Sequence, residues 1–189
     1  LARAEAAGIR TVTTYGMSET CGGCVYAGRP LDGVEVRIDA DDRIVLIGPV
    51  VASGYLGVPE HPAFPVPRTF VTDDLGIFSG GTLTALGRAD DVIVSGGLKV
   101  PPAPVERALA SLPGIGEVLV GGVPDPEWGR LVVAVVTGAV PPEGTVDAAL
   151  AGLPRHYRPR RFVTVHALPL HGPGKPDRRA AAALAESAE

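Results

Sequence analysis

The stretch that decides the fold is Gly87-Arg88-Ala89-Asp90-Asp91-Val92-Ile93-Val94-Ser95-Gly96-Gly97-Leu98-Lys99-Val100-Pro101-Pro102-Ala103-Pro104-Val105-Glu106. Its apolar run at residues 92–94 predicts a strand, and the two glycines that follow end that strand before a helix that begins at prolines. Short strands and glycine turns precede the stretch, whereas helices alternate with strands after it. We therefore predict two domains, residues 1–87 and residues 88–189.

Length and composition indicate a globular protein and limit its classes of partner. The 189 residues are 46% hydrophobic, enough to bury a core in one large or two small domains. The formal net charge of −4 argues against nucleic acid or an anionic membrane surface as a partner, because both repel an acidic protein without a dense basic patch. No apolar run approaches the ~20 residues of a membrane-spanning helix, and the first residues do not resemble a signal peptide.

The two cysteines, Cys21 and Cys24, form a single C-x-x-C pair. A structural zinc site needs four ligands, and the chain has no second cysteine pair. A redox role would call for the strand and helix pattern of a thioredoxin-like site, which is absent around this pair. We interpret both as small packed thiols of a reduced, cytoplasmic protein. A metal-binding or redox module is the alternative outside enzyme chemistry.

The first candidate site follows residues 10–15, whose β-branched composition predicts a buried strand. The expected loop after that strand is Tyr15-Gly16-Met17-Ser18-Glu19-Thr20. It suits a nucleotide, because a hydroxyl can face phosphate oxygens, a carboxylate can hold Mg²⁺ and an aromatic ring can lie against adenine. The alternative is an ordinary connection between strand and turn, with a solvated glutamate.

The chain from residue 28 to residue 86 predicts short strands at residues 34–38, 43–47, 76–78 and 82–86. Their alternation, with turn signals at Asp41-Asp42 and Gly80-Gly81, predicts a small antiparallel barrel or curved sheet. The segment from Gly48 to Tyr55 is interpreted as structural. Residues 59–67, with four prolines, are expected to form an extended surface loop.

A second candidate site is Thr72-Asp73-Asp74-Leu75-Gly76. A single carboxylate can accept hydrogen bonds from both hydroxyls of a ribose 2′,3′-diol. The alternative is a turn in which an aspartate caps backbone amides.

The second domain is predicted to be a compact α+β unit of about 100 residues. We expect helices at residues 102–112 and 145–153, the latter capped by Thr145, and strands at residues 117–122, 131–137 and 161–167. Trp128, between two of the strands, is interpreted as a packing residue. The basic cluster is interpreted as a solvated loop, with attraction of coenzyme A phosphates as the alternative; its members are Arg155, His156, Arg158, Arg160 and Arg161.

Only Lys99 and Lys175 are lysines among the 17 Lys and Arg residues. Lys175 ends the segment Pro169-Leu170-His171-Gly172-Pro173-Gly174-Lys175. A flexible ammonium group suits a position where negative charge develops between a carboxylate and an α-phosphate. The alternative is a surface lysine, and His171 is interpreted as a loop residue.

In this order, these motifs resemble the adenylate-forming enzymes, the superfamily of acyl-CoA synthetases, luciferases and peptide-synthetase adenylation domains. Residues 15–20 resemble Y-G-x-T-E with Ser18 for Thr, and residues 72–74 resemble T-G-D with Asp73 for Gly. Residues 48–55 resemble G-P-x-x-x-x-G-Y, and residues 169–175 resemble P-x-x-x-x-G-K. Residues 87–106 resemble the hinge and the start of the family's second domain. The resemblance extends over residues 10–178.

The resemblance implies a reaction in two steps and a role for each matching residue. Carboxylate and MgATP first give an acyl-adenylate, and a rotation about the hinge then exposes the adenylate to the thiol of coenzyme A. The implied roles are catalysis of adenylation by Lys175, Glu19 and Ser18; magnesium binding by Glu19; nucleotide contacts from Tyr15, Gly16, Asp74 and Arg88; guidance of the pantetheine by Gly96 and Gly97; and a hinge at Asp90.

The resemblance also implies the fold and a missing part. Residues 1–87 would be a β-barrel-like remnant of the family's large N-terminal domain, and residues 88–189 its mobile α+β domain. Residues 1–8 predict a helix already under way without a cap, and no stretch resembles the family's upstream phosphate loop. We therefore interpret the chain as a C-terminal fragment that alone does not turn over.

Within the superfamily, residues 14–26 are most similar to o-succinylbenzoate-CoA ligases of menaquinone biosynthesis. This implies ATP, Mg²⁺ and coenzyme A as cofactors and o-succinylbenzoate as the carboxylic acid. The small residues from Cys21 to Cys24 would leave room for a bulky aromatic acid. The alternatives are an acyl-CoA synthetase for another fatty or aromatic acid and an adenylation domain that loads a separate carrier protein.

Overall fold

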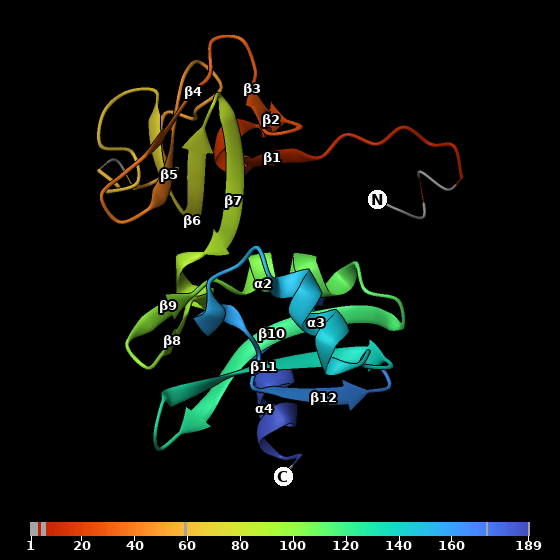
Figure 1. The fold of residues 1–189 in the computed structure, drawn as a ribbon. Coiled ribbons are helices and arrows are strands. Elements are labelled where there is room, and N and C mark those ends of the chain that lie inside the picture. The colour runs from red at the N-terminus through yellow and green to blue at the C-terminus, as the bar shows by residue number, and fades with distance from the viewer. Residues whose placement is uncertain (1–3, 5–6, 59, 173, 189) are drawn as a thin grey trace. The chain divides into compact units, whose positions relative to one another are not determined.

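The computed structural model describes residue 4 and residues 7–58, 60–172 and 174–188 (Figure 1). Within it the chain divides into two compact units, Leu1–Ala89 and Asp90–Glu189. The helix expected over residues 1–8 falls mostly outside the described residues. Each unit has its own buried core, as expected of a chain whose composition supports two small domains.

The first unit begins with a three-stranded antiparallel sheet in the order β1-β2-β3, from strands β1 (Thr14–Met17), β2 (Gly22–Tyr26) and β3 (Arg29–Pro30). The prediction of a buried strand at residues 10–15 was wrong. The strand begins at Thr14, where pairing with Tyr26 of β2 begins, and residues 10–14 are exposed. Propensity for a strand is realised only where a partner strand runs alongside.

The predicted loop at residues 15–20 was also placed wrongly. Its first half belongs to β1, and its second half forms the 3-10 helix η1 (Ser18–Thr20). The buried Thr20 side chain secures this turn, because its Oγ1 accepts a bond from Met17 N–H at 3.0 Å and donates to Gly22 O at 2.8 Å. Glu19 is therefore held on a short, well-supported helix.

A four-stranded antiparallel sheet follows, and it confirms the predicted small antiparallel sheet. Its order is β4-β5-β6-β7, from strands β4 (Glu35–Ile38), β5 (Arg43–Ile47), β6 (Thr69–Ser79) and β7 (Thr82–Arg88). Strand β5 shows the expected alternation, with Ile44 and Leu46 fully buried in the core. The turns at Asp41-Asp42 and Gly80-Gly81 lie where the sequence predicted them.

Strand β6 is longer than predicted, and irregular pairing interrupts it where the second candidate motif lies. Against β5 the register shifts between the pairs Arg43↔Leu75 and Val45↔Val71, so residues 72–74 of β6 form a bulge. The pairing with β7 shifts as well, between Leu75 and Gly76. Such bulges redirect side chains, and here they lie at the two aspartates of the motif.

The second unit contains two short hairpins, a mixed sheet and three α-helices in its described part. Its elements are η2 (Ala89–Asp91, which starts at the last residue of the first unit), β8 (Ile93–Ser95), β9 (Leu98–Val100), α2 (Pro102–Ala110), β10 (Ile115–Asp125), β11 (Gly129–Gly138), α3 (Glu143–Leu150), η3 (Arg155–Tyr157), β12 (Arg161–Val165), β13 (Leu170–His171), β14 (Lys175–Pro176) and α4 (Arg178–Glu186).

The sheet of this unit has the order β10-β11-β12 and is covered by helices on both faces (Figure 1). Val132, Ala134 and Val136 of β11 pack into one core with α2 and α3. Val133 and Val135 point the other way, into a second core with Ala181 and Ala185 of α4. A strand buried on both faces reads as a continuous apolar run, which is the pattern of residues 131–136.

In this unit one helix prediction needed correction, and one helix was not predicted. Helix α3 begins at Glu143 rather than Thr145, because the carbonyl of Pro142 accepts bonds from the N–H groups of Thr145 and Val146. The hydroxyl of Thr145 therefore does not cap the helix. Helix α4 was not predicted, although Asp177 caps it by accepting a 2.9 Å bond from Ala180 N–H.

A partly buried ion-pair network joins α4 to the start of the unit. The Arg178 guanidinium donates to both oxygens of Glu106, with Nη2 to Oε2 at 2.9 Å, and its Nε donates to Asp91 Oδ2 at 3.1 Å. Burial alone would lower the pKa of Arg178, but the bond and charge of Glu106, together with Asp91, raise it. The network ties the residue after Asp90 to the body of the unit.

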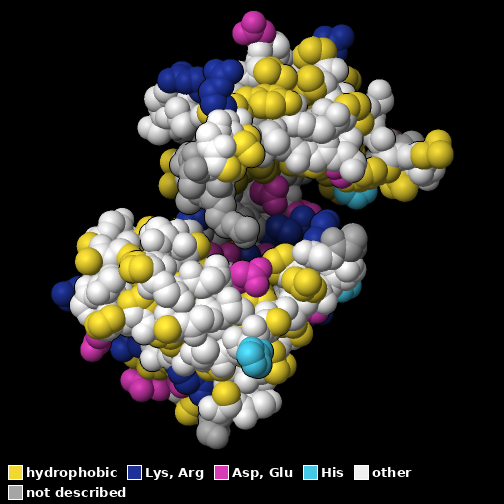
Figure 2. All heavy atoms as spheres, turned by 90° about the vertical axis from the view of Figure 1, so that its right-hand side faces the viewer, with side chains coloured by type: hydrophobic (Ala, Val, Ile, Leu, Met, Phe, Trp, Pro, Cys, Tyr) yellow, Lys and Arg dark blue, Asp and Glu magenta, His cyan; other side chains and the backbone are white. Residues whose placement is uncertain are grey.

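Surface charges are mixed on the face seen in Figure 2. Acidic and basic side chains occur in several separate places among hydrophobic and polar ones. Across the described residues, no helix is long and apolar enough to cross a membrane.

Candidate functional site

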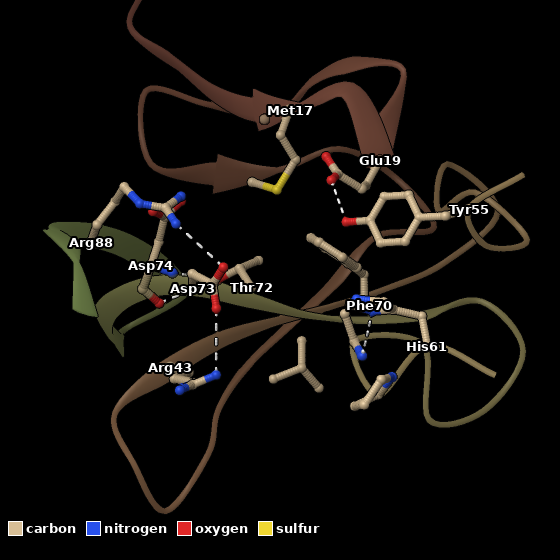
Figure 3. Close-up of a pocket in the computed structure, with 14 residues that line it drawn as sticks. Met17, Glu19, Arg43, Tyr55, His61, Phe70, Thr72, Asp73, Asp74 and Arg88 are labelled. Atoms are coloured by element: carbon tan, nitrogen blue, oxygen red, sulfur yellow. Dashed lines mark hydrogen bonds and ion pairs between the residues drawn. The ribbon is translucent and has the colours of Figure 1, made fainter. Parts of the chain in front are cut away.

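A pocket of about 410 Å³ lies in the first unit, between η1, strand β6 and the loop around Tyr55 and His61 (Figure 3). Four residues predicted from the sequence line it: Gly16, Glu19, Asp74 and Arg88. They come from β1, η1, β6 and β7, so the sheet topology brings together both candidate motifs. Ser18 and Tyr15 belong to the same segments but do not line this pocket.

Glu19 projects from η1 toward Tyr55 (Figure 3). The phenol of Tyr55 donates a 2.6 Å hydrogen bond to Glu19 Oε1. This bond, with a smaller effect of burial, raises the pKa of Tyr55 to about 12. One carboxylate oxygen is thus engaged, and acceptor capacity remains on the other.

Asp74 is held by the residue that the sequence placed against adenine. Tyr15 Oη donates to Asp74 Oδ2 at 2.8 Å, and Thr72 Oγ1 accepts from the backbone N–H of Asp74 at 3.0 Å. Burial, followed by the charge of Asp74 and the bond to it, raises the pKa of Tyr15 well above its usual value. Tyr15 therefore keeps its proton and orients this carboxylate.

Asp73, which stands where the resemblance expects glycine, faces different partners. Its Oδ1 lies 3.5 Å from Arg43 Nη1, and its Oδ2 accepts from Arg88 Nη2 at 3.3 Å (Figure 3). The Asp73 side chain is 59% exposed, so these pairs are screened by solvent. Both neighbouring aspartates line the pocket because the bulge at residues 72–74 breaks the regular alternation of β6.

Gly16 is required by close packing of two backbones. A Cβ atom at this position would overlap the carbonyl of Gly22 and the Cα of Gly23 on β2. The β1–β2 pairing shifts register between Tyr15 and Gly16, which brings the strands together there. Gly16 therefore allows β1 and β2 to pack closely at the point where β1 reaches the pocket.

The sequence analysis did not identify Arg43, Tyr55 and His61 as pocket residues. The G-P-x-x-x-x-G-Y pattern ends at Tyr55 and was the available signal, but it was interpreted as structural only. The Tyr55 ring packs edge-on against His61 and Phe64, with ring centroids 4.8 and 5.1 Å apart. Arg43 carried no signal, because it is one of many arginines in the chain.

The predicted site residues that have not yet been described all belong to the second unit. Asp90 lies in η2, and Gly96 and Gly97 form the β8–β9 turn with φ of +56° and +79°. Gly96 N–H donates to the carbonyl of Trp128 at 2.9 Å, and its Cα rests against the indole, where a Cβ would lie 2.8 Å from a ring carbon. Lys175 is exposed in β14, paired with His171 of β13.

The basic cluster is used in part for packing within the second unit. Arg158 pairs with Glu143 and Asp147 of α3, and the Arg160 guanidinium lies 4.9 Å from the centre of the Trp128 ring. Arg161 Nη2 donates to Ala185 O of α4 at 2.6 Å. These contacts agree with the interpretation of Trp128 as a packing residue.

The cysteines are free thiols in different surroundings. Cys21 is exposed and adopts φ of +55°, whereas Cys24 is fully buried and burial raises its pKa. His166 and His171 have the spacing of a zinc-binding histidine pair. Within the described part of the chain, however, no three His, Cys, Asp or Glu side chains gather as a metal centre would require.

Magnesium in nucleotide sites needs a smaller protein contribution. Mg²⁺ is commonly bound through one or two carboxylates, with phosphates and water completing its shell. Glu19 fits that requirement, since it lines the pocket and one of its oxygens is not engaged by Tyr55. Asp74 also lines the pocket, where Tyr15 and Thr72 fix its position in β6.

Comparison with known proteins identifies relatives of this chain. Residues 104–175 match the family described as AMP-binding enzyme C-terminal domain. A probable 2-succinylbenzoate–CoA ligase of Mycobacterium tuberculosis is 45% identical over 185 residues, which are 94% of this chain and 48% of the relative. The 2-succinylbenzoate–CoA ligase of Enterococcus faecalis is 30% identical, over 93% of this chain and 41% of the relative.

A solved structure has a similar fold. The o-succinylbenzoate CoA synthetase of Bacillus subtilis, in complex with the acyl-adenylate intermediate OSB-AMP, superimposes with a TM-score of 0.76 at 28% identity. The match covers 94% of this chain and 42% of that one, so the chain spans about half the length of the relatives it matches, or less. Residues 104–175 thus match the AMP-binding enzyme C-terminal domain, and over 94% of its length the chain is similar to part of 2-succinylbenzoate–CoA ligases.

Proposed function

We propose that this chain is the C-terminal part of an AMP-forming acid–thiol ligase that joins 2-succinylbenzoate to coenzyme A. The observation that carries the proposal is the pocket shared by Glu19, Asp74 and Arg88, which come from three separate elements. A carboxylate for a cation, a carboxylate for a ribose diol and a guanidinium for phosphate or ribose together suit an adenine nucleotide. The relatives' names supply the acid.

In the proposed adenylation step, the residues of the first unit hold the nucleotide. Asp74, kept in place by Tyr15, accepts hydrogen bonds from the ribose hydroxyls, and Arg88 adds a positive charge beside it. Ser18, exposed at the start of η1, offers its hydroxyl to the α-phosphate. A magnesium ion held by Glu19 would neutralise phosphate charge as pyrophosphate leaves. The work of these residues is positioning and charge stabilisation.

The second unit supplies the two faces that alternate in the proposed cycle. Lys175 is exposed on a short hairpin, where its ammonium can approach the developing charge between the carboxylate and the α-phosphate. Gly96 and Gly97 form a turn without side chains, suited to close passage of the pantetheine arm. Asp90, between the units, is the proposed hinge.

The proposal is tested with the longer protein that contains this chain. It should release pyrophosphate from ATP with 2-succinylbenzoate and form the thioester when coenzyme A is added. A panel of benzoate, medium-chain and malonate-type acids serves as the control for substrate choice. Equal turnover across the panel would overturn the substrate, and no ATP-dependent thioester with any acid would overturn the ligase assignment.

The 189 residues alone provide a second test. We expect no exchange of pyrophosphate into ATP by this piece, because the phosphate loop and most of the acyl pocket of the family are expected upstream of Tyr15. Measured exchange would show that the residues described here suffice for adenylation.

A further inference from the structure

Two hydrogen bonds join the segment that contains Tyr55 to Glu19. The Tyr55 phenol donates to Glu19 Oε1 at 2.6 Å, and in the same segment Ala52 N–H donates to the backbone carbonyl of Glu19 at 2.8 Å. The segment after Gly48 therefore holds Glu19 at its backbone and at its carboxylate. A carboxylate on a three-residue helix would otherwise be free to rotate about its side-chain bonds.

The ring of Tyr55 is itself fixed from the core of the first unit. Phe70 of β6 is 5% exposed and lies 5.0 Å from the Phe64 ring. The Phe64 ring in turn packs edge-on against the Tyr55 ring, with centroids 5.1 Å apart. The His61 ring also packs edge-on against the Tyr55 ring, at 4.8 Å. His61 is oriented by accepting a 3.2 Å bond from Ala63 N–H. A series of ring contacts thus runs from the sheet to the hydroxyl that touches Glu19.

We propose that Tyr55 is a positioning residue that aims the Glu19 carboxylate at the divalent cation accompanying the nucleotide. This inference rests on the proposed function, because it takes Glu19 as the protein's contact to that cation. Oxygen Oε1 is occupied by the phenol, which leaves Oε2 to face the cation. A neutral donor suits this role, because it orients the carboxylate without cancelling its charge, as an arginine would.

The test separates cation binding from nucleotide binding without using turnover. On the longer protein, the dissociation constant of ATP is measured by calorimetry with saturating Mg²⁺ and again in EDTA, and that of AMP is measured in EDTA. The ATP dissociation constant in EDTA divided by that in saturating Mg²⁺ gives a ratio that reports the contribution of the cation. Tyr55→Phe should reduce that ratio about 10-fold, in line with the loss of a partner that orients a metal ligand, and should leave the AMP constant within about 2-fold.

Two further variants show whether Tyr55 acts through Glu19. Glu19→Gln should reduce the same ratio, and Tyr55→Phe added to Glu19→Gln should reduce it no further, because a partner has no effect once its target is removed. Tyr26→Phe is the matched control, since Tyr26 is also partly exposed in the first unit and does not line the pocket. Tyr26→Phe should change neither the ATP ratio nor the AMP dissociation constant.

The outcomes distinguish the inference from the proposed function. If Tyr55→Phe lowers AMP binding in EDTA as much as it lowers MgATP binding, Tyr55 is only a wall of the pocket and the inference is overturned. An unchanged ratio in Tyr55→Phe, or an equal further loss in the Glu19→Gln background, overturns it as well. If the unaltered protein binds neither ATP nor AMP, it is the proposed nucleotide site that fails.

Discussion

The phenol of Tyr15 donates a 2.8 Å hydrogen bond to Asp74 Oδ2, joining two residues 59 positions apart in the sequence. The bond connects β1 to β6 at the edge of the pocket. The Tyr15 hydroxyl thereby fixes the carboxylate proposed to bind ribose, in addition to the predicted contact of the Tyr15 ring with adenine.

Tyr15→Phe should weaken AMP binding and lower stability together. The change removes a part-buried bond to a charged acceptor, which contributes about 1.5–3 kcal/mol in typical proteins. We expect AMP affinity to fall about 10-fold and the thermal midpoint to fall by a few degrees, by calorimetry and by thermal unfolding. Tyr26→Phe is the control. Unchanged AMP affinity with a lowered midpoint would restrict Tyr15 to a structural role.

The two neighbouring aspartates should respond differently to loss of charge. Asp74→Asn should reduce AMP affinity about 10-fold or more, because an amide replaces the acceptor proposed for the ribose diol. Asp73→Asn should change it by about 3-fold at most, since its pairs with Arg43 and Arg88 are solvent-exposed. AMP titration of both variants decides the question, and a larger effect at Asp73 would reverse the assignment.

Gly16→Ala should distort the pocket through the backbone. The new methyl group would overlap the Gly22 carbonyl on β2, so the strands must separate, at a cost of about 1–3 kcal/mol. Gly144→Ala is the matched control, because nothing lies within 4 Å of its Cβ position in α3. Thermal unfolding should show a lower midpoint for the first variant and an unchanged or slightly higher midpoint for the second. Equal midpoints would contradict the packing argument.

Lys175→Ala should separate the two half-reactions of the longer protein. Adenylation should fall by about 10²–10³-fold, because a charge aimed at the developing transition state is lost. Thioester formation from a supplied acyl-adenylate should remain largely intact in Lys175→Ala. The control is Arg179→Ala, which removes an exposed cation of α4 and should leave both steps intact. Rapid-quench assays of each step measure the split. Equal losses in both steps would refute the division of labour between the two faces.

The two thiols should differ in reactivity, and the buried one should make the stability of the fold depend on pH. Burial raises the pKa of Cys24 above its ordinary value of 9.0, whereas Cys21 is exposed. Because the folded state holds the Cys24 proton more tightly than the unfolded state does, this group stabilises the fold below pH 9.0 and its contribution is lost as the pH rises above that value. Iodoacetamide should therefore modify Cys21 first, with Cys24 reacting at the same rate only in urea. Equal rates in the folded protein would contradict the burial of Cys24.

Several features of the fold could be predicted because their signals are local. Residues 43–47 and residues 131–137 were each predicted to form a strand, and the structure has β5 and β11 there. Paired turn residues marked the hairpin turns. The order of the nucleotide, hinge and lysine motifs identified the family, because each motif depends on residue types at short, fixed spacing.

Other features depended on hydrogen-bond partners that the sequence pattern did not indicate. The start of β1 is set by pairing with Tyr26, and the start of α3 by the carbonyl of Pro142 rather than by the hydroxyl of Thr145. Nothing near Tyr55 indicates that its hydroxyl reaches Glu19, 36 positions away. The motif at residues 72–74 left open which aspartate faces the arginines.

The residues by themselves determined which groups are available: two carboxylates, an arginine and a lysine in motifs of recognisable order, with glycines where backbones must approach. The tertiary structure decided what each group touches. A bulge in β6 turned Asp73 toward Arg43 and Arg88 and left Asp74 to Tyr15, and the loop after Gly48 brought Tyr55 to Glu19. The reason is physical: the direction of a side chain depends on strand register and on hydrogen bonds between segments far apart along the chain, and these exist only once the sheets have formed.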